Sequence, residues 1–120
     1  MGFTRDGRWL VAAREDVFQC LEVGTWRPAG DVSHEHPRVF AQALPANSRW
    51  VAVEQGRRGR VQFCELPTLR PFLTLDTAGG FPLCFSPDDR LLLTRRGGGH
   101  FGLWNLGRIR NALAPQGLAW

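Results

Sequence analysis

A glycine-rich stretch is the feature of this sequence whose spacing comes nearest to a catalytic or cofactor-binding motif. Residues Gly97–Gly102, GGGHFG, fit the pattern G-x-G-x-x-G. A dinucleotide-binding loop should open a helix, and a kinase loop needs a phosphate-pairing lysine and catalytic Asp and Asn motifs. This stretch leads into a strand pattern, and all fifteen basic residues are arginine. We therefore expect a hairpin turn and no bound cofactor.

Histidines and acids are the other residues that could do chemistry. His34 and His36 stand one residue apart, so on a strand they would face the same side. A structural zinc site needs four ligands and a catalytic one needs three, but His100 is the one histidine that remains. Asp88 and Asp89 occupy a turn, and no serine lies in a G-x-S-x-G elbow. We therefore expect no metal site and no enzyme.

The cysteines show neither metal-ligand spacing nor an even count. Cys20, Cys64 and Cys84 each lie among apolar residues, which predicts three buried free thiols. The N-terminal residues lack the apolar core of a signal peptide. No apolar run reaches the roughly 18 residues of a membrane helix. These features predict a cytoplasmic chain that does not enter a membrane.

The formal charge of +4 and a pI near 10.1 permit nucleic-acid binding. Stacking of bases needs exposed aromatic residues, and here the aromatic residues lie in apolar strand patterns. Solvated arginines are the simpler interpretation. Nucleic-acid or polyanion binding through arginine-rich loops stays an alternative.

A repeat of 41 residues positions these groups. Phe3–Val11, Leu44–Ala52 and Phe85–Leu93 align at successive shifts of 41 residues. Each copy reads apolar residue, short polar turn, Arg, apolar strand, and the turn residues are types that favour tight turns. We expect Phe3, Leu44 and Phe85 at equivalent buried positions.

A second element follows each copy of the first. Phe18–Val23, Val61–Leu66 and Phe101–Leu106 read as strands that are apolar on both faces. An Arg-Pro turn after the first two of them leads to a further strand. Each unit therefore predicts about four short strands. In the third unit the last strand is replaced by a short helix over 108–113, with Ile109 and Leu113 on one face.

These residues resemble a known family. Phe85–Leu92 followed by Leu103–Leu106 is similar to a WD-repeat (WD40) blade, with Trp104-Asn105 where that family has its Trp-Asp pair. The family has a period of about 40 to 45 residues and four strands per blade. The stretch Trp104–Trp120 also resembles the end of long bacterial WD-repeat proteins. The resemblance implies a non-catalytic protein–protein interaction module or scaffold, with a remnant of a catalytic propeller as an alternative.

The predicted fold is all-β, a partial β-propeller of about three four-stranded antiparallel blades with a short C-terminal helix. We expect blade 1 over 1–38 with an incomplete first strand, blade 2 over 39–80, blade 3 over 81–106 and a helical tail over 107–120. Blades need neighbours on both sides, and propellers close rings of about four to eight. We therefore expect a fragment of a larger propeller, whose partners are the missing blades, another protein or a second copy. Trp104 should be buried.

Strand order predicts one binding rim. In each blade the turn between the second and third strands lies at the same end as the loop to the next blade. Loops on a rigid scaffold commonly carry binding residues, and arginine pairs well with carboxylates. We predict a rim for an acidic protein partner made of Arg14, His34, His36, Arg38, Arg57, Arg58, Arg60, Arg95, Arg96 and His100.

Overall fold

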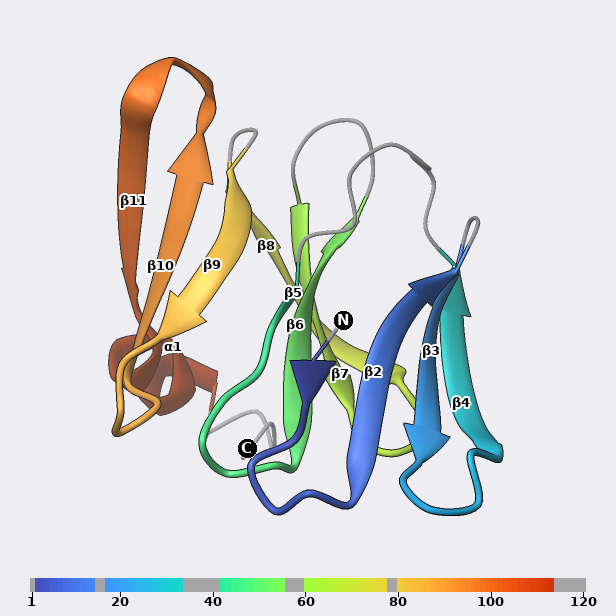
Figure 1. The fold of residues 1–120 in the computed structure, drawn as a ribbon. Helices are drawn as coiled ribbons and strands as arrows, with labels where there is room; N and C mark the ends of the chain where they lie inside the picture. The colour runs from blue at the N-terminus through green and yellow to red at the C-terminus, as the bar shows by residue number, and fades with distance from the viewer. Residues whose placement is uncertain (1, 15–16, 34–41, 56–59, 78–79, 114–120) are drawn as a thin grey trace.

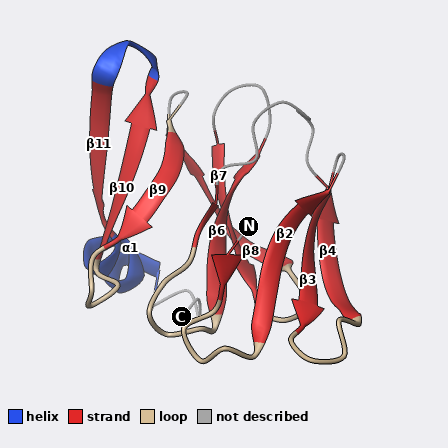
Figure 2. Cartoon of the chain, in the orientation of Figure 1, coloured by secondary structure: helices blue, strands red, loops and turns tan. Residues whose placement is uncertain are grey.

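The computed structural model describes residues 2–14, 17–33, 42–55, 60–77 and 80–113. Their strands form three antiparallel sheets in which each strand pairs with the next along the chain. Figure 1 shows the sheets side by side, fanned about one edge, and Figure 2 shows that nearly all regular structure is strand. The fold is all-β and has the arrangement of a partial propeller.

Each sheet is one blade. Blade 1 contains β1 (Gly2–Phe3), β2 (Trp9–Arg14), β3 (Val17–Glu22) and β4 (Pro28–Ser33), and blade 2 contains β5 (Gln42–Ala43), β6 (Trp50–Gln55), β7 (Arg60–Glu65) and β8 (Arg70–Asp76). Blade 3 contains β9 (Phe81–Phe85), β10 (Leu91–Arg96) and β11 (His100–Asn105). The glycine-rich stretch is the β10–β11 hairpin, with the short 3₁₀ turn η1 (Gly97–Gly99), as predicted. The helix α1 (Leu106–Leu113) takes the place of a fourth strand in blade 3.

Two extended apolar contacts hold the blades together. We call the side of a blade that meets the next blade its forward face, and the opposite side its backward face. The forward face of blade 2 consists of Ala43, Trp50, Ala52, Val61 and Phe63, all buried. It packs against the backward face of blade 3, which presents Phe85, Leu92 and Trp104. Apolar positions on both faces of each strand therefore produce a stack of sheets.

Aromatic rings anchor the contact between blades 2 and 3. The ring of Trp50 lies edge-on to Phe63 within its own blade, with centroids 5.3 Å apart. It also lies edge-on to Phe85 of blade 3 at 5.0 Å. Both geometries are favourable for aromatic quadrupoles.

The contact between blades 1 and 2 repeats this plan with different side chains. Phe18 and Cys20 of blade 1 meet Val51, Val53 and Cys64 of blade 2, all buried. The turn between β7 and β8 adds Leu69, which is 1% exposed and packs in the same cluster. A Cβ at Gly30 of β4 would overlap the backbone carbonyl of Thr68 in this turn, so glycine permits the close approach.

The polar turns that join the first two strands of each blade share one design. The amides of Arg8, Arg49 and Arg90 donate to the side chains of Asp6, Asn47 and Asp88, at 3.0, 2.8 and 3.0 Å. The residue between each pair has a positive φ: Gly7 at 74°, Ser48 at 59° and Asp89 at 58°. Asn, Asp and Gly tolerate this conformation and favour such turns.

The positive-φ residue of each later blade also binds the turn of the blade before it. The amides of Ala46 and Asn47 in blade 2 donate to the Asp89 carboxylate at 2.7 and 3.0 Å. The amide of Asp6 in blade 1 donates to Ser48 Oγ at 3.1 Å. We call these hydrogen bonds the turn latches. They join neighbouring blades at the end of the molecule opposite the predicted rim.

Four core predictions need correction. Phe3 is 57% exposed, because the backward face of blade 1 has no sheet against it among the described residues. Leu44, Phe85 and Trp104 are partly buried and pack against the two apolar clusters. Leu44 and Phe85 lie at the ends of first strands, and Trp104 lies on the edge strand β11, which has no fourth strand beside it. Repeat equivalence alone therefore overestimates their burial.

The helix α1 begins two residues earlier than predicted. Leu106 is fully buried and Ile109 packs against the cluster between blades 2 and 3. The amide of Leu106 donates to the carbonyl of Arg90 at 2.7 Å, which fixes the helix start below β10. Pro115, expected to end the helix, lies outside the described residues. None of the helices in the described part of the chain is long and apolar enough to cross a membrane.

The turn latch at Asp89 can be tested directly. Asp89→Gly keeps the left-handed backbone but removes both acceptors, so it should lower the free energy of unfolding by about 1–3 kcal/mol. Asp89→Asn retains one oxygen acceptor and should lose clearly less. Both values come from urea melts followed by tryptophan fluorescence. Equal losses below about 0.5 kcal/mol for the two variants would show that the latch does not stabilise the stack.

Candidate protein-binding surfaces

The described members of the predicted rim lie at one end of the blades. Arg60 begins β7, Arg95 lies near the end of β10 and His100 begins β11, and all three side chains are exposed. Arg14 and Arg96 end β2 and β10 at the same end of the sheets (Figure 1). His34, His36, Arg38, Arg57 and Arg58 lie outside the described residues. The described positions therefore share one end of neighbouring blades.

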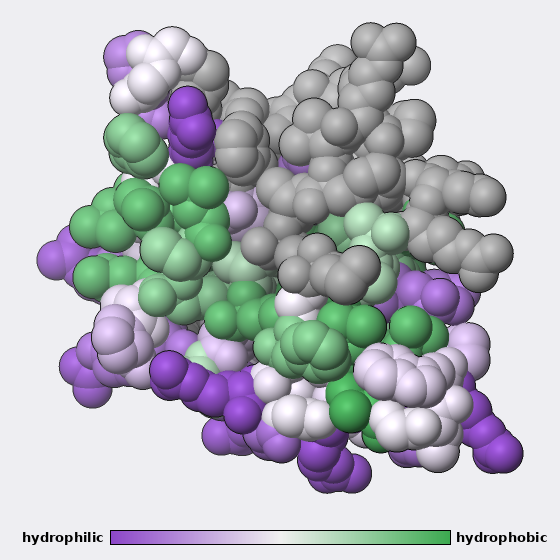
Figure 3. Space-filling model, in the orientation of Figure 1, coloured by the Kyte–Doolittle hydropathy of each residue, from purple (hydrophilic) through white to green (hydrophobic). Residues whose placement is uncertain are grey.

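An apolar surface borders this end on blade 3. Phe101 is 63% exposed and Leu103 is 67% exposed, both on the edge strand β11. Arg95 stands directly opposite Phe101 in the β10–β11 register. Figure 3 shows hydrophobic side chains gathered over β9–β11. Exposed apolar patches of this kind commonly mark interaction sites, and this one lies on the last blade, where a stack of three repeats predicted an uncovered face.

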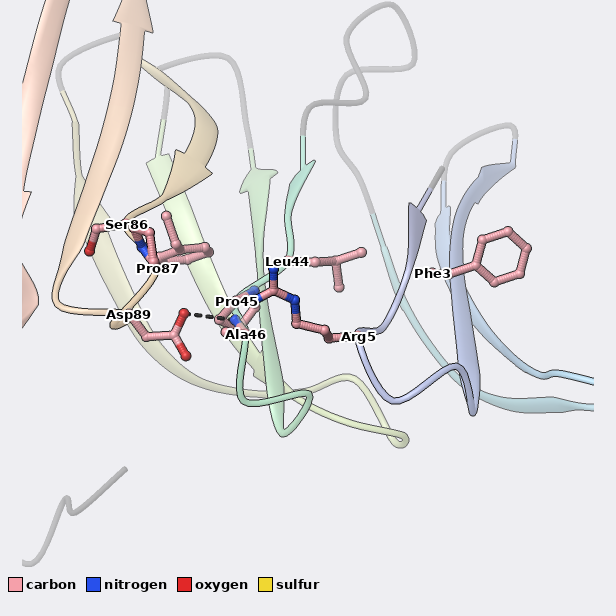
Figure 4. A pocket seen from close by; sticks show the side chains of 9 residues that line it. Phe3, Arg5, Leu44, Pro45, Ala46, Ser86, Pro87 and Asp89 are labelled. Atoms are coloured by element: carbon pink, nitrogen blue, oxygen red, sulfur yellow. Dashed lines mark hydrogen bonds between the residues drawn. The ribbon is translucent and has the colours of Figure 1, made fainter.

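A hollow of about 290 Å³ lies at the opposite end, between the polar turns of the three blades. Figure 4 shows Arg5 of blade 1 and Asp89 of blade 3 reaching toward the turn of blade 2 that contains Ala46. Its lining residues come from equivalent positions of the repeat: Phe3, Arg5, Leu44, Pro45, Ala46, Phe85, Ser86, Pro87 and Asp89. Sequence reasoning placed binding at the other end and missed this hollow, although the 41-residue alignment contains its signal.

Ser86 and Asp89, two polar residues that line the hollow, form hydrogen bonds within and between the turns. Ser86 Oγ donates to Asp88 at 2.6 Å and accepts the amide of Leu91 at 3.0 Å. The Asp89 carboxylate accepts hydrogen bonds from two backbone amides of blade 2. A nucleophile needs a neighbouring base, and the hydroxyl of Ser86 is paired with a carboxylate that also holds a turn. The Ser86 hydroxyl and the Asp89 carboxylate therefore act in the turns that shape the hollow.

Two exposed turn carboxylates have lowered pKa values. The hydroxyl of Thr4 is the largest cause for the lowered pKa of Asp6, and the hydroxyl of Ser86 is the largest cause for that of Asp88. In each case a backbone amide, of Arg8 or of Arg90, acts in the same direction. Hydrogen bonds to the charged form explain both directions. These acids are turn-forming groups, as the sequence suggested.

The cysteines fall into two environments. Cys20 and Cys64 are buried, and burial raises the pKa of their thiols to about 11 and about 12. Cys84 is exposed, which corrects the prediction of three buried thiols. It lies on the forward face of blade 3, which no described sheet covers. Within the described residues, no group of three or more His, Cys, Asp and Glu side chains is placed to hold a metal ion.

Comparison with known proteins supports the architecture. No protein-family model and no curated protein sequence matches this chain. Among solved structures, the chain is similar to Kuenenia stuttgartiensis hydrazine synthase, with a TM-score of 0.73 over 88% of this chain at 16% sequence identity. The chain spans 32% of the length of that neighbour. A likeness at this identity shows a shared fold and carries no activity across.

The thiol environments predict selective labelling. In dilute protein at about pH 8, iodoacetamide should add once, at Cys84, because buried thiols with raised pKa values supply little thiolate. Unfolding in guanidinium should allow three additions. Intact mass and peptide mapping distinguish the sites. Rapid native labelling of Cys20 or Cys64 would contradict the burial of the blade 1–blade 2 contact.

Proposed function

We propose that this chain is a non-catalytic protein-binding module of the WD-repeat type, part of a larger propeller assembly, that contacts an acidic protein surface through its rim. The observation that carries the proposal is the exposure of Arg60, Arg95 and His100 at one end of adjacent blades. Rigid strands hold these positions, so the charges are pre-arranged before a partner arrives.

The chemistry of the rim favours carboxylates. Arginine presents a planar fork that can pair with a carboxylate through two hydrogen bonds. No salt bridge joins Arg60 or Arg95 to an acid among the contacts of the described residues. Their guanidinium groups are therefore available to a partner, and association should weaken with salt.

The WD-repeat type is supported by the repeat and its strands. The 41-residue period corresponds to one blade, and Trp104-Asn105 ends β11 where the family pair ends its strand. Trp104 Nε1 donates to Thr94 Oγ1 at 3.2 Å, so the ring is held across the sheet from β10. These features favour a structural part for Trp104, as a blade-stabilising residue.

Polyanion binding is the second candidate, favoured by the net charge of +4. It requires many phosphate contacts, each of which steepens the salt dependence. No exposed aromatic residue accompanies the basic positions of the described rim except Phe101. Stacking platforms use several aromatic residues in succession, so this candidate has less support.

A charge-reversal pair tests the rim. Proteins captured by the tagged chain are identified by mass spectrometry and compared with those captured by Arg60→Glu/His100→Glu. The rim variant should bind the same partner at least about tenfold more weakly, since it removes the positive charge of Arg60 and adds two carboxylates that repel an acidic surface. The matched control is Arg27→Glu/Arg70→Glu, which changes exposed residues at the opposite end of the strands.

Two outcomes count against binding of an acidic protein partner at the rim. One is equal loss of the partner in rim and control variants. The other is a bound single-stranded DNA oligonucleotide that competes with the partner and is lost in the rim variant, which would favour the polyanion candidate. Circular dichroism establishes that each variant remains folded.

A further inference from the structure

The forward face of blade 3 is apolar and uncovered in the described structure. Its apolar residues are Cys84, Leu91, Leu93, Phe101 and Leu103, which the strand register places in adjacent rows, and the same register puts Arg95 and Asn105 on this face. Cys84, Phe101 and Leu103 are exposed, and Leu91 and Leu93 are half-buried. These apolar positions correspond, one for one, to the forward face of blade 2: Ala43, Trp50, Ala52, Val61 and Phe63.

The matching face of blade 2 shows what such a surface binds. Its five residues are at most 4% exposed because the backward face of blade 3 lies on them. The surface equivalent to it therefore fits another blade of the same kind, presenting its backward face.

The backward face of blade 1 is exposed in part: Leu10 on it is 8% exposed, but its strand neighbour Phe3 is not covered. Phe3, equivalent to Leu44 and Phe85, is 57% exposed. Trp26, which has a φ of 58°, is equivalent to Leu69 at 57°, yet Trp26 is 51% exposed while Leu69 is 1% exposed. Leu69 packs into the preceding blade, so Trp26 is placed to do the same. Blade 3 has α1 in place of a fourth strand, so the turn that carries Trp26 would meet no strand equivalent to β4 there.

The turn latches differ at the two ends in a matching way. Gly7 occupies the latch position of blade 1 and has no side chain to accept a hydrogen bond. Pro87 occupies the position of Ala46 in blade 3 and has no amide to donate. If blade 1 followed blade 3, Gly7 would offer no acceptor and Pro87 would need none. Only the amide of Asp88, which is equivalent to Asn47, would lack its latch partner, and it lies in an exposed turn where water can accept the hydrogen bond.

From these surfaces we infer that a second copy of this chain binds head to tail, with the forward face of blade 3 on the backward face of blade 1. Such an interface is heterologous, and it forms a ring when the rotation closes. Two copies of three blades give six blades, within the range of about four to eight in closed propellers, while three copies exceed it. The expected assembly is a dimer with two equivalent junctions. Arg95 of the rim also lies on the forward face of blade 3, opposite Phe101, so the two proposals are separated by variants that leave Arg95 unchanged.

Complementation between face variants tests the head-to-tail arrangement. Leu103→Asp disables the forward face and Trp26→Asp disables the backward face, and Asp tolerates the positive φ at that position. Each variant alone should dimerise at least roughly a hundredfold more weakly, because it buries an unpaired carboxylate against apolar side chains. Mixing the two variants restores one intact junction, so a tagged copy of one should capture the other. Arg49→Asp, exposed on the middle blade, is the control and should dimerise normally.

Size-exclusion chromatography with light scattering, run at several micromolar protein concentrations, measures the mass of the assembly. This mass is compared with the 13.5 kDa of one chain, and a dimer has twice that mass. Iodoacetamide labelling gives an independent readout, since Cys84 should become protected as the dimer forms, like its equivalent Ala43. A wild-type monomer at all concentrations overturns the inference. So does a dimer that loses stability with Leu103→Asp alone and shows no complementation, because that result indicates a symmetric contact between two copies of blade 3. A variant that loses binding to the acidic partner but keeps the mass of the dimer bears on the proposed rim and leaves the head-to-tail dimer untouched.

Discussion

The structure depends on one constraint: a blade has two apolar faces, and a single sheet can cover neither. Blade 2 satisfies it completely, with Val51 and Val53 buried on its backward face and Ala52 and Phe63 on its forward face. Burial of each large apolar side chain contributes about 1.5–3 kcal/mol, so these contacts supply most of the stabilisation. Blades 1 and 3 satisfy it on one side each among the described residues. Phe3 on blade 1 and Phe101 and Leu103 on blade 3 are exposed on the two faces that remain.

Polar turns give this non-directional packing its alignment. Apolar faces alone permit sliding of one sheet over another, since the hydrophobic effect has no preferred direction. Asp89 and Ser48 each bind amides of the preceding turn. Hydrogen bonds of fixed length at one end of the strands set how each blade lies against its neighbour. The residues that hold the blades therefore also shape the hollow between the turns.

Among the described residues, the side-chain hydrogen bonds between blades lie at this turn end of the strands. Arg60, Arg95 and His100 lie at the opposite end of the strands and are exposed. A propeller can thus separate stabilising turns from binding turns, because hairpin strands alternate in direction. This separation is the physical basis for proposing a binding rim on residues whose replacement leaves the blade contacts intact.

The sequence by itself determined the local structure. The 41-residue period, the polar turns and the two-faced apolar strands predicted three antiparallel sheets, the β10–β11 hairpin and a helix in place of the last strand. These features are decided within about forty residues, by turn chemistry and side-chain alternation. For the same reason the rim positions on β7, β10 and β11 could be assigned to one end from strand order alone.

Only the tertiary structure decided which equivalent residues are covered. Ala43 and Cys84 occupy the same repeat position, yet one is buried and the other exposed, because a blade lies on the first and none described lies on the second. Leu69 and Trp26 differ for the same reason. The burial of a residue depends on the blade that packs against it. Equivalent residues have the same local sequence pattern in every repeat, so that pattern cannot show which repeat has a neighbouring blade on that side.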